Sequence, residues 1–241
     1  MRYKNTVRAK FIKRPNRFIA YCKIGDVEDK VHVPNTGRCK ELFTEGADVI
    51  LSKADENSKR KTKYSLVSVY KGDRLINIDS QAPNAIVEEG LKEGKILCEY
   101  NFTKIAREKK YDNSRFDIYY EREEDGKNIK GFIEVKGVTL EHNNRCLFPD
   151  APTERGVKHM MELIKASKDG YEANILFLVQ MSGVTDFSPN YEMHREFAET
   201  LAKAEQEGVK IHSYSCDVKE DEVKVSTPVK ICDLSAFLKG I

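Results

Sequence analysis

The apolar pattern of this chain changes once, close to Pro83. Before that residue, short segments alternate apolar with polar side chains and are separated by turn residues. After it, stretches with helical spacing are interleaved with strand-like runs. Because one chain of 241 residues carries two such different patterns, we expect two domains, with residues 1–82 in the first and residues 83–241 in the second.

The first segment has the pattern of a small β-barrel. Residues 7–11 alternate apolar and basic side chains, as a half-exposed strand does. Further strands are expected at 18–22, 30–33, 49–52, 64–70 and 75–78, and a short helix at 38–43. Several short strands with one short helix in about 80 residues favour an OB-fold.

The second segment has a mixed α/β pattern. Asp125-Gly126 is a turn signal between two strand-like runs and predicts a hairpin. Residues 174–181 are an almost unbroken apolar run, typical of a strand covered on both faces. Helices are expected at 83–95, 153–168 and 192–207, and strands at 101–107, 115–121, 129–136, 174–181, 209–214 and 222–225. The order α-β-β-β-α-β-α-β belongs to the mixed α/β class.

Composition excludes several classes of protein. No stretch approaches the ~20 apolar residues that span a bilayer, so no membrane association is expected. The six cysteines form no CxxC motif and the five histidines no HExxH motif, which argues against a zinc site. With no apolar secretion signal at the N-terminus, the expected setting is cytoplasmic, with reduced thiols.

Charge is divided unevenly between the two segments. Residues 1–82 contain 18 basic and 10 acidic side chains, a net charge of +8, whereas the remaining 23 basic and 29 acidic side chains give −6. The first 17 residues hold seven basic side chains and no acidic one. This division predicts a polyanion-binding first domain beside a second domain with another task, although a solvated lysine-rich surface has the same composition.

The sharpest candidate site is formed by Asp117, Glu134 and Lys136. Residues i and i+2 of a strand face the same side, so Glu134 and Lys136 project together while Val135 faces the core. Asp117 lies on the expected hairpin partner. Two carboxylates and an ammonium at one spot suit magnesium-dependent phosphodiester hydrolysis, with Asp117 and Glu134 as metal ligands and Lys136 as the catalytic cation. The alternative is a surface ion pair of little energetic value.

Two further groups of residues have the chemistry of phosphate contacts. In the expected helix at 153–168, Arg155 and Lys158 are candidates, and His159 would bond a phosphate or an active-site acid; a solvated helix face is the alternative. In the first domain, cations flank a tyrosine that would stack on bases, although tyrosines in strands usually pack: Lys59, Arg60, Lys61, Lys63 and Tyr64. Arg38 ends a turn that would offer donors to an anion.

Five short segments of the chain form a specific set of motifs. The segments are His32-Val-Pro-Asn-Thr-Gly-Arg38, Ser114-Arg-Phe-Asp117, Ile133-Glu-Val-Lys-Gly-Val-Thr-Leu140, Phe148-Pro-Asp-Ala-Pro-Thr-Glu-Arg-Gly156 and Lys158-His159. Together they resemble the sugar fermentation stimulation protein A family, and the match runs in order over nearly the whole chain, from about residue 10 to residue 230. The resemblance implies an N-terminal OB-fold, a C-terminal domain of the PD-(D/E)XK nuclease type and non-specific DNA binding.

The resemblance also assigns roles to residues of this chain. Asp117 matches the first metal-binding acid, and Glu134 and Lys136 match the Glu-x-Lys pair, although Phe116-Asp117 stands where Pro-Asp would be. An additional acid on the preceding helix would be Glu88 or Glu89, with Glu89 favoured. The predicted function is DNA binding with hydrolysis at a Mg²⁺ or Mn²⁺ site; the alternative is a non-catalytic nucleic-acid-binding regulator of sugar metabolism. Whether the chain forms a homodimer is left open.

Overall fold

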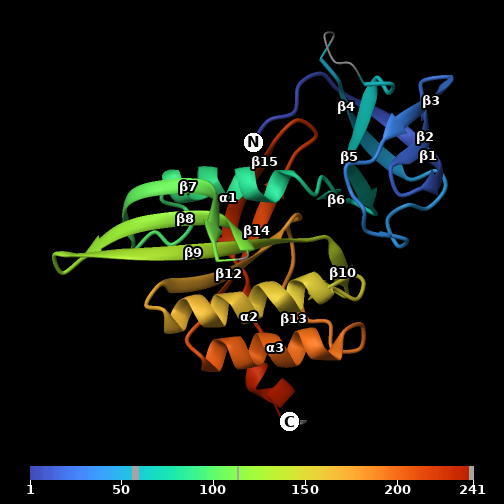
Figure 1. Ribbon diagram of the computed structural model, residues 1–241. Coiled ribbons are helices and arrows are strands. Elements are labelled where there is room, and N and C mark those ends of the chain that lie inside the picture. Colours follow the sequence, from blue (N-terminus) through green and yellow to red (C-terminus); the bar gives the residue numbers. More distant parts are fainter. Residues whose placement is uncertain (56–59, 113, 239–241) are drawn as a thin grey trace.

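The computed structural model describes residues 1–55, 60–112 and 114–238 and shows two lobes (Figure 1). The first lobe is a β-structure and the second combines sheets with helices, so the protein is of the mixed α/β class that the sequence predicts. β6 ends at Asn77 and α1 begins at Ala82. The division between residues 82 and 83 stays a prediction. Among the described residues, no helix combines the length and apolar character needed to cross a bilayer.

The first lobe is an OB-like barrel. Its six strands pair in the order β3-β2-β1-β4-β5-β6, and a parallel pairing between β3 and β5 at His32 and Ser65 closes the sheet on itself. The strands are β1 Thr6–Asn16, β2 Ile19–Ile24, β3 Val27–His32, β4 Asp48–Lys53, β5 Tyr64–Lys71 and β6 Arg74–Asn77. Alternating side chains such as Phe11, Val31 and Leu51 fill its interior.

The short helix expected at residues 38–43 is wrong, because this segment forms turns. The Arg14 guanidinium donates a hydrogen bond of 3.0 Å to the Arg38 carbonyl. In an α-helix this carbonyl would instead accept the N–H of Leu42. That N–H and the N–H of Phe43 both donate to the Cys39 carbonyl at 3.1 Å. Cys39 itself has φ +43°, in the left-handed region. Contacts with the neighbouring strand β1 therefore override the local helical pattern.

The second lobe is built on a six-stranded sheet in the order β15-β14-β12-β9-β8-β7. β9, β12 and β14 run parallel, and β7, β8 and β9 form an antiparallel meander with the predicted hairpin turn at Asp125-Gly126. The strands are β7 Asn101–Tyr111, β8 Ser114–Glu124, β9 Lys127–Val138, β12 Glu172–Val179, β14 Lys210–Val218 and β15 Val223–Pro228. β12 is buried on both faces, as its apolar run predicts.

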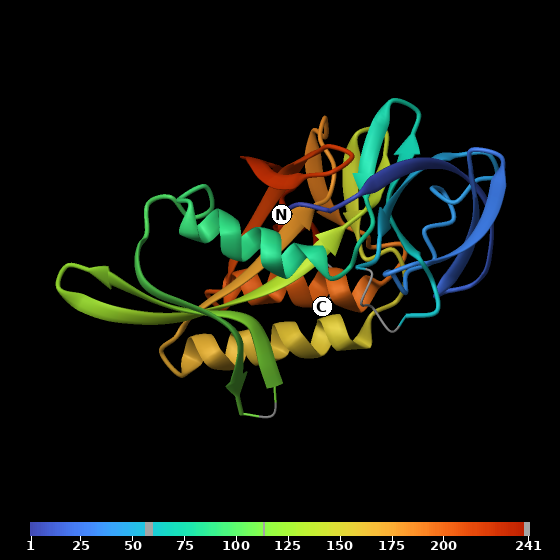
Figure 2. The same cartoon turned by 90° about the horizontal axis from the view of Figure 1, so that it is seen from above.

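Helices cover both faces of this sheet (Figures 1 and 2). α1 Ala82–Lys92 packs on one face through Ile86, Val87 and Leu91. α2 Glu154–Lys168 covers the other face, with α3 Arg195–Gln206 beside it. Thr153 caps α2 by accepting the N–H of Gly156 at 3.1 Å. Residues of β8 and β9 therefore lie between α1 and α2 and can contact side chains of both helices.

A second, four-stranded sheet was not expected from the sequence. Its order is β10-β11-β13-β16, and it adjoins the barrel through Lys71 and Arg74, which both pair with Glu141 of β10. The strands are β10 Leu140–His142, β11 Arg145–Phe148, β13 Asp186–Pro189 and β16 Lys230–Ile231, and a 3₁₀ turn, Leu234–Leu238, follows. Ion pairs and a buried Asn77–Gln180 hydrogen bond of 2.7 Å therefore join the two lobes.

Candidate active site

Glu134 and Lys136 of β9 project from the same face of the sheet, toward α2. Lys136 Nζ donates to Glu134 Oε1 at 2.6 Å, and Val135 between them packs on the α1 side. The side chain of Glu134 is only 2% exposed and that of Lys136 15%. A buried pair of this kind differs from the surface ion pair left open by the sequence, because neither group keeps its full hydration.

Asp117 joins this pair where two strands separate. The regular pairing of β8 with β9 ends at Ile118 and Ile133. One residue further, the Asp117 carboxylate takes the place of a backbone acceptor: its Oδ2 receives the N–H of Val135 at 2.8 Å. Asn84 of α1 donates to Oδ1 at 2.8 Å. Main chain and helix therefore hold the carboxylate from two sides.

The pKa values of the two carboxylates shift in opposite directions. Burial, followed by the negative charge of Glu134, raises the pKa of Asp117 above its ordinary value. Burial also acts to raise the pKa of Glu134, but its contacts with His159 and Lys136 outweigh that effect and hold it below its ordinary value. A divalent cation would favour the ionised form of both groups and relieve the repulsion between them.

One oxygen of the cluster has no partner. Glu134 Oε2 is buried and accepts no hydrogen bond from any residue the structure describes. A buried carboxylate oxygen without a partner costs free energy, so such atoms are uncommon without a functional reason. Hard divalent cations bind through carboxylate oxygens of this kind. Asp117 and Glu134 thus fit the predicted divalent cation by their chemistry.

His159 of α2 orients Glu134. The Nε–H of Arg155 donates to His159 Nε2 at 3.2 Å, so that ring nitrogen carries no proton. The proton is then on Nδ1, which donates to Glu134 Oε1. His159 is only 8% exposed and bonds the acid, one of the two roles expected for it. Lys158 points away and pairs loosely with Glu162, at 3.8 Å.

The structure does not bring Glu89 to the acids. Its carboxylate pairs with the amino group of Met1, and Glu88 pairs with Lys92 and lies 3.9 Å from Arg107. Asn84 lies one turn or more before these residues and is the α1 side chain that contacts Asp117. The α1 side chain bonded to Asp117 is therefore an amide, and the carboxylate of Glu89 is paired with the N-terminal amino group. Glu89 as the third ligand stays a prediction.

The predicted first-domain contacts are dispersed. Arg60 donates to Ser65 Oγ at 2.7 Å, Lys61 and Lys63 are exposed, and Tyr64 packs partly on the barrel core. Lys59 lies outside the described residues. Arg38 is exposed and lines a cavity of the first lobe.

Another group with metal-binding chemistry lies at the starts of α2 and α3. One ligand atom each from Glu154, His194 and Glu196 lies within 4.8 Å of the others. The two glutamate side chains are 84% and 63% exposed, so water screens their charges. The Asp117–Glu134 pair, in contrast, is already desolvated and oriented. Sequence spacing did not indicate this second group, because its histidine is 40 residues from the first glutamate.

An OB-like barrel followed by an α/β domain with a largely buried Asp–Glu–Lys cluster defines a two-domain, nuclease-like protein. Comparison with known families agrees with this class. Residues 12–78 match the profile described as the SfsA N-terminal OB domain. Residues 81–222 match the one described as the sugar fermentation stimulation protein RE domain. The chain belongs to the sugar fermentation stimulation protein family.

Relatives align with nearly the whole chain. A sugar fermentation stimulation protein homolog of Clostridium novyi is 52% identical over 96% of this chain and 99% of its own length. One from Alkaliphilus oremlandii is 48% identical over 96% of this chain and 98% of its own. The solved structure of Pyrococcus furiosus SfsA in complex with Ca²⁺ is 25% identical, with a TM-score of 0.82 over 97% of this chain and 98% of that one. The architecture described above is thus shared by a solved relative.

Proposed function

We propose that this protein hydrolyses phosphodiester bonds of nucleic acid, with DNA favoured, at a divalent-metal site formed by Asp117 and Glu134. One observation carries the proposal: a buried carboxylate, a half-buried carboxylate and an ammonium meet where β8 and β9 separate, and Glu134 Oε2 there has no hydrogen-bond partner among the described residues. The restriction endonuclease-like family domain and the Ca²⁺ bound by the Pyrococcus relative support it. Mg²⁺ or Mn²⁺ is the proposed cofactor, because both take oxygen ligands.

The residues divide the work as follows. A divalent cation, when bound, lowers the pKa of a water molecule and offsets negative charge on the phosphate. Asp117 and Glu134 would hold it, and the bonds from Asn84 and the Val135 N–H keep Asp117 in place. Lys136 supplies a positive charge beside the scissile phosphate.

His159 and Arg155 form a supporting chain behind Glu134. Because His159 donates to Oε1, the second oxygen of Glu134 stays directed away from that hydrogen bond. These contacts position Glu134, and through them α2 supports the acid on the β8–β9 hairpin.

Cleavage of labelled single- and double-stranded DNA and RNA tests the proposal. Wild-type protein with Mg²⁺ or Mn²⁺ should release products, and both Glu134→Ala and Lys136→Ala should lose the activity. Glu123→Ala removes an exposed acid near the tip of the β8–β9 hairpin and should cleave like wild type. Cleavage that survives in both site variants would contradict the assignment.

A second candidate, a nucleic-acid-binding regulator that does not cleave, is favoured by the net charge of +8 in residues 1–82. Such a protein would bind nucleic acid with an affinity that falls as salt rises, and it would release no cleavage products from any of the substrates with either metal. The same assay, paired with a binding measurement, therefore separates the two functions.

A further inference from the structure

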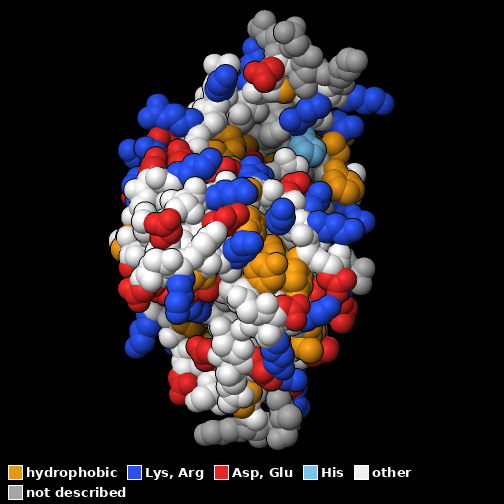
Figure 3. Space-filling model, turned by 60° about the vertical axis from the view of Figure 1, so that its left-hand side comes forward, with side chains coloured by type: hydrophobic (Ala, Val, Ile, Leu, Met, Phe, Trp, Pro, Cys, Tyr) orange, Lys and Arg blue, Asp and Glu red, His pale blue; other side chains and the backbone are white. Residues whose placement is uncertain are grey.

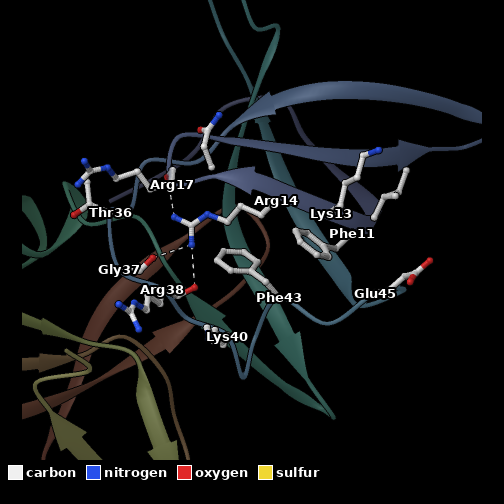
Figure 4. Close-up of a pocket in the computed structure, with 12 residues that line it drawn as sticks. Phe11, Lys13, Arg14, Arg17, Thr36, Gly37, Arg38, Lys40, Phe43 and Glu45 are labelled. Carbon is white, nitrogen blue, oxygen red and sulfur yellow. Dashed lines mark hydrogen bonds between the residues drawn. The ribbon is translucent and has the colours of Figure 1, made fainter. Parts of the chain in front are cut away.

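A cavity of about 600 Å³ opens in the first lobe, between the end of β1 and the segment that joins β3 to β4 (Figure 4). It is of the size that holds small ligands. Lys13, Arg14 and Arg17 come from β1 and its turn, and Arg38 and Lys40 from the connecting segment. The predicted contacts at residues 59–64 lie on a different loop. Lys13, Arg14 and Arg17 belong to the basic first 17 residues, and Arg38 was expected to offer donors to an anion.

Most cations of this cavity have no acidic partner. Lys13, Arg17, Arg38 and Lys40 form no ion pair with any carboxylate among the described residues, and Glu45 is the one acid in the lining. Figure 3 shows Lys and Arg interspersed with Asp and Glu on the side from which β7–β9 protrude. The cavity thus concentrates positive charge that the protein itself does not neutralise.

Arg14 gives the cavity its shape. Its guanidinium donates to the carbonyls of Asn35 at 2.6 Å and Gly37 at 2.8 Å, which ties β1 to the connecting segment. Its charged carbon lies 4.8 Å from the ring centre of Phe43, and that ring stacks on Phe11 at 5.3 Å. Among the described residues, no carboxylate forms an ion pair with the Arg14 guanidinium. The result is an apolar wall beside a fixed positive charge.

A ligand for this cavity needs an anionic part for the cations and a flat apolar part for the Phe11–Phe43 wall. A nucleotide has both. Bases within a duplex are stacked and paired, so only an unpaired nucleotide can place its base against such a wall. We propose that this cavity binds an unpaired nucleotide of a single-stranded nucleic acid, with the base at Phe43 and the phosphates at Arg17, Arg38 and Lys40.

The cavity also leads toward the candidate active site. Thr36 and Gly37 line both this cavity and a second one of about 340 Å³, which continues to Gly137 and Thr153. Gly137 follows Lys136 in β9, and Thr153 is the cap of α2. A strand held in the first lobe would therefore lie beside a second cavity whose lining comes within one residue of Lys136. In this respect the inference rests on the proposed function: it assigns the hydrolase a substrate with a single-stranded segment.

Fluorescence anisotropy with the full-length protein in EDTA tests the inference, because no cleavage occurs under that condition. The probes are a short labelled single strand, as DNA and as RNA, and a blunt DNA duplex of the same length. Arg38→Ala/Lys40→Ala removes two exposed cations of the cavity. Lys127→Ala/Lys203→Ala is the matched control, because it removes two exposed lysines of the second lobe that have no ion pair among the described residues.

We expect the single strand, of either sugar, to bind at least about tenfold more tightly than the duplex. The cavity variant should weaken it by about tenfold, as the loss of phosphate contacts does, and the control by less than about twofold. Three results would overturn the inference: equal affinity for duplex and strand, no effect of the cavity variant, or thymidine monophosphate binding as tightly as the strand. The last would indicate a free nucleotide as the ligand.

The two proposals fail separately. Strand affinity is measured in EDTA, where no cleavage occurs, so it reports on the cavity separately from the metal site. Loss of strand affinity in the cavity variant supports the cavity whether or not the wild type cleaves. Cleavage lost in Glu134→Ala supports the active site whether or not the cavity variant binds.

Discussion

The two lobes handle charge in opposite ways. In the second lobe, a buried acid lies beside a half-buried acid and a half-buried lysine, and hydrogen bonds from β9, α1 and α2 hold them. In the first lobe, four cations stand exposed around a cavity, and only Arg14 is held by a network of carbonyls. A fixed, desolvated cluster suits a small ion and a reacting bond, whereas exposed flexible cations suit a polymer whose phosphates must slide. Substitutions in the acid cluster should therefore change the rate of cleavage, and substitutions at the cavity should change the affinity for nucleic acid.

The largest expected effect is on the rate of cleavage. Lys136→Ala should lower kcat by about 10²–10³, the loss typical for removing one group that stabilises transition-state charge. Strand affinity in EDTA should stay within about twofold, since the contact is made to the reacting phosphate. Lys130→Ala, an exposed lysine on the same strand β9, is the control and should leave kcat unchanged. A fall in affinity with unchanged kcat would mean that the two lobes do not divide binding from chemistry as described.

Gly37→Ala should disturb the joint between the two cavities. A Cβ at this position would lie 2.7 Å from Asp150 Oδ2 and 2.9 Å from Asn35 Oδ1. Relieving such overpacking typically costs about 1–3 kcal/mol of unfolding free energy. Chemical denaturation measures the loss, and Gly46→Ala is a comparison with a positive φ and open space around it. If Gly37→Ala unfolds with the same free energy as wild type, the Asp150 side chain moves aside without cost and the prediction is wrong.

Asp117→Asn should stabilise the metal-free protein at neutral pH while abolishing cleavage. The raised pKa of Asp117 means that its charged form is disfavoured in the folded state, so the neutral amide removes that cost. A gain of about 1 kcal/mol would raise Tm by about 2–4 °C. As pH falls through the folded pKa of Asp117, the wild-type carboxyl takes up a proton and wild type gains stability, so the difference should narrow. A stability difference between Asp117→Asn and wild type that grows toward acid pH would contradict this prediction.

The smallest effect concerns salt. Single-strand affinity falls with salt by about 0.7 in log–log slope for each phosphate contact. Arg38→Ala/Lys40→Ala should therefore reduce the slope by about 1.4, and Glu134→Ala should leave it unchanged. An equal slope in the cavity variant would place the phosphate contacts elsewhere.

Much of the fold could be predicted because its patterns are local. The turn at Asp125-Gly126 and the apolar run at 174–181 indicate the β8–β9 hairpin and the buried strand β12 directly. The four-stranded sheet gives no such signal. Its strands have between two and four residues, and β11 pairs with β13 across about 40 residues of chain. A strand this short is defined by its partner rather than by its own periodicity.

Part of the candidate site could likewise be predicted from the sequence, and part could not. The shared face of Glu134 and Lys136 follows from the two-residue period of a strand, and the hairpin brings Asp117 near them. The rotation of α1 does not follow from its apolar stripe closely enough to choose Asn84 over Glu89. The cavity of the first lobe is beyond sequence patterns altogether, because Arg14 organises it through main-chain carbonyls, which every residue carries.

Metal-binding calorimetry tests the central claim most directly. Mg²⁺ and Mn²⁺ would be titrated into wild type and into Asp117→Asn/Glu134→Gln, each alone and with a short DNA. These substitutions keep the size of both side chains and remove only their charges. The account predicts binding to wild type that disappears in the double variant. Absence of binding to wild type, even with DNA present, or equal binding to both proteins, would contradict it.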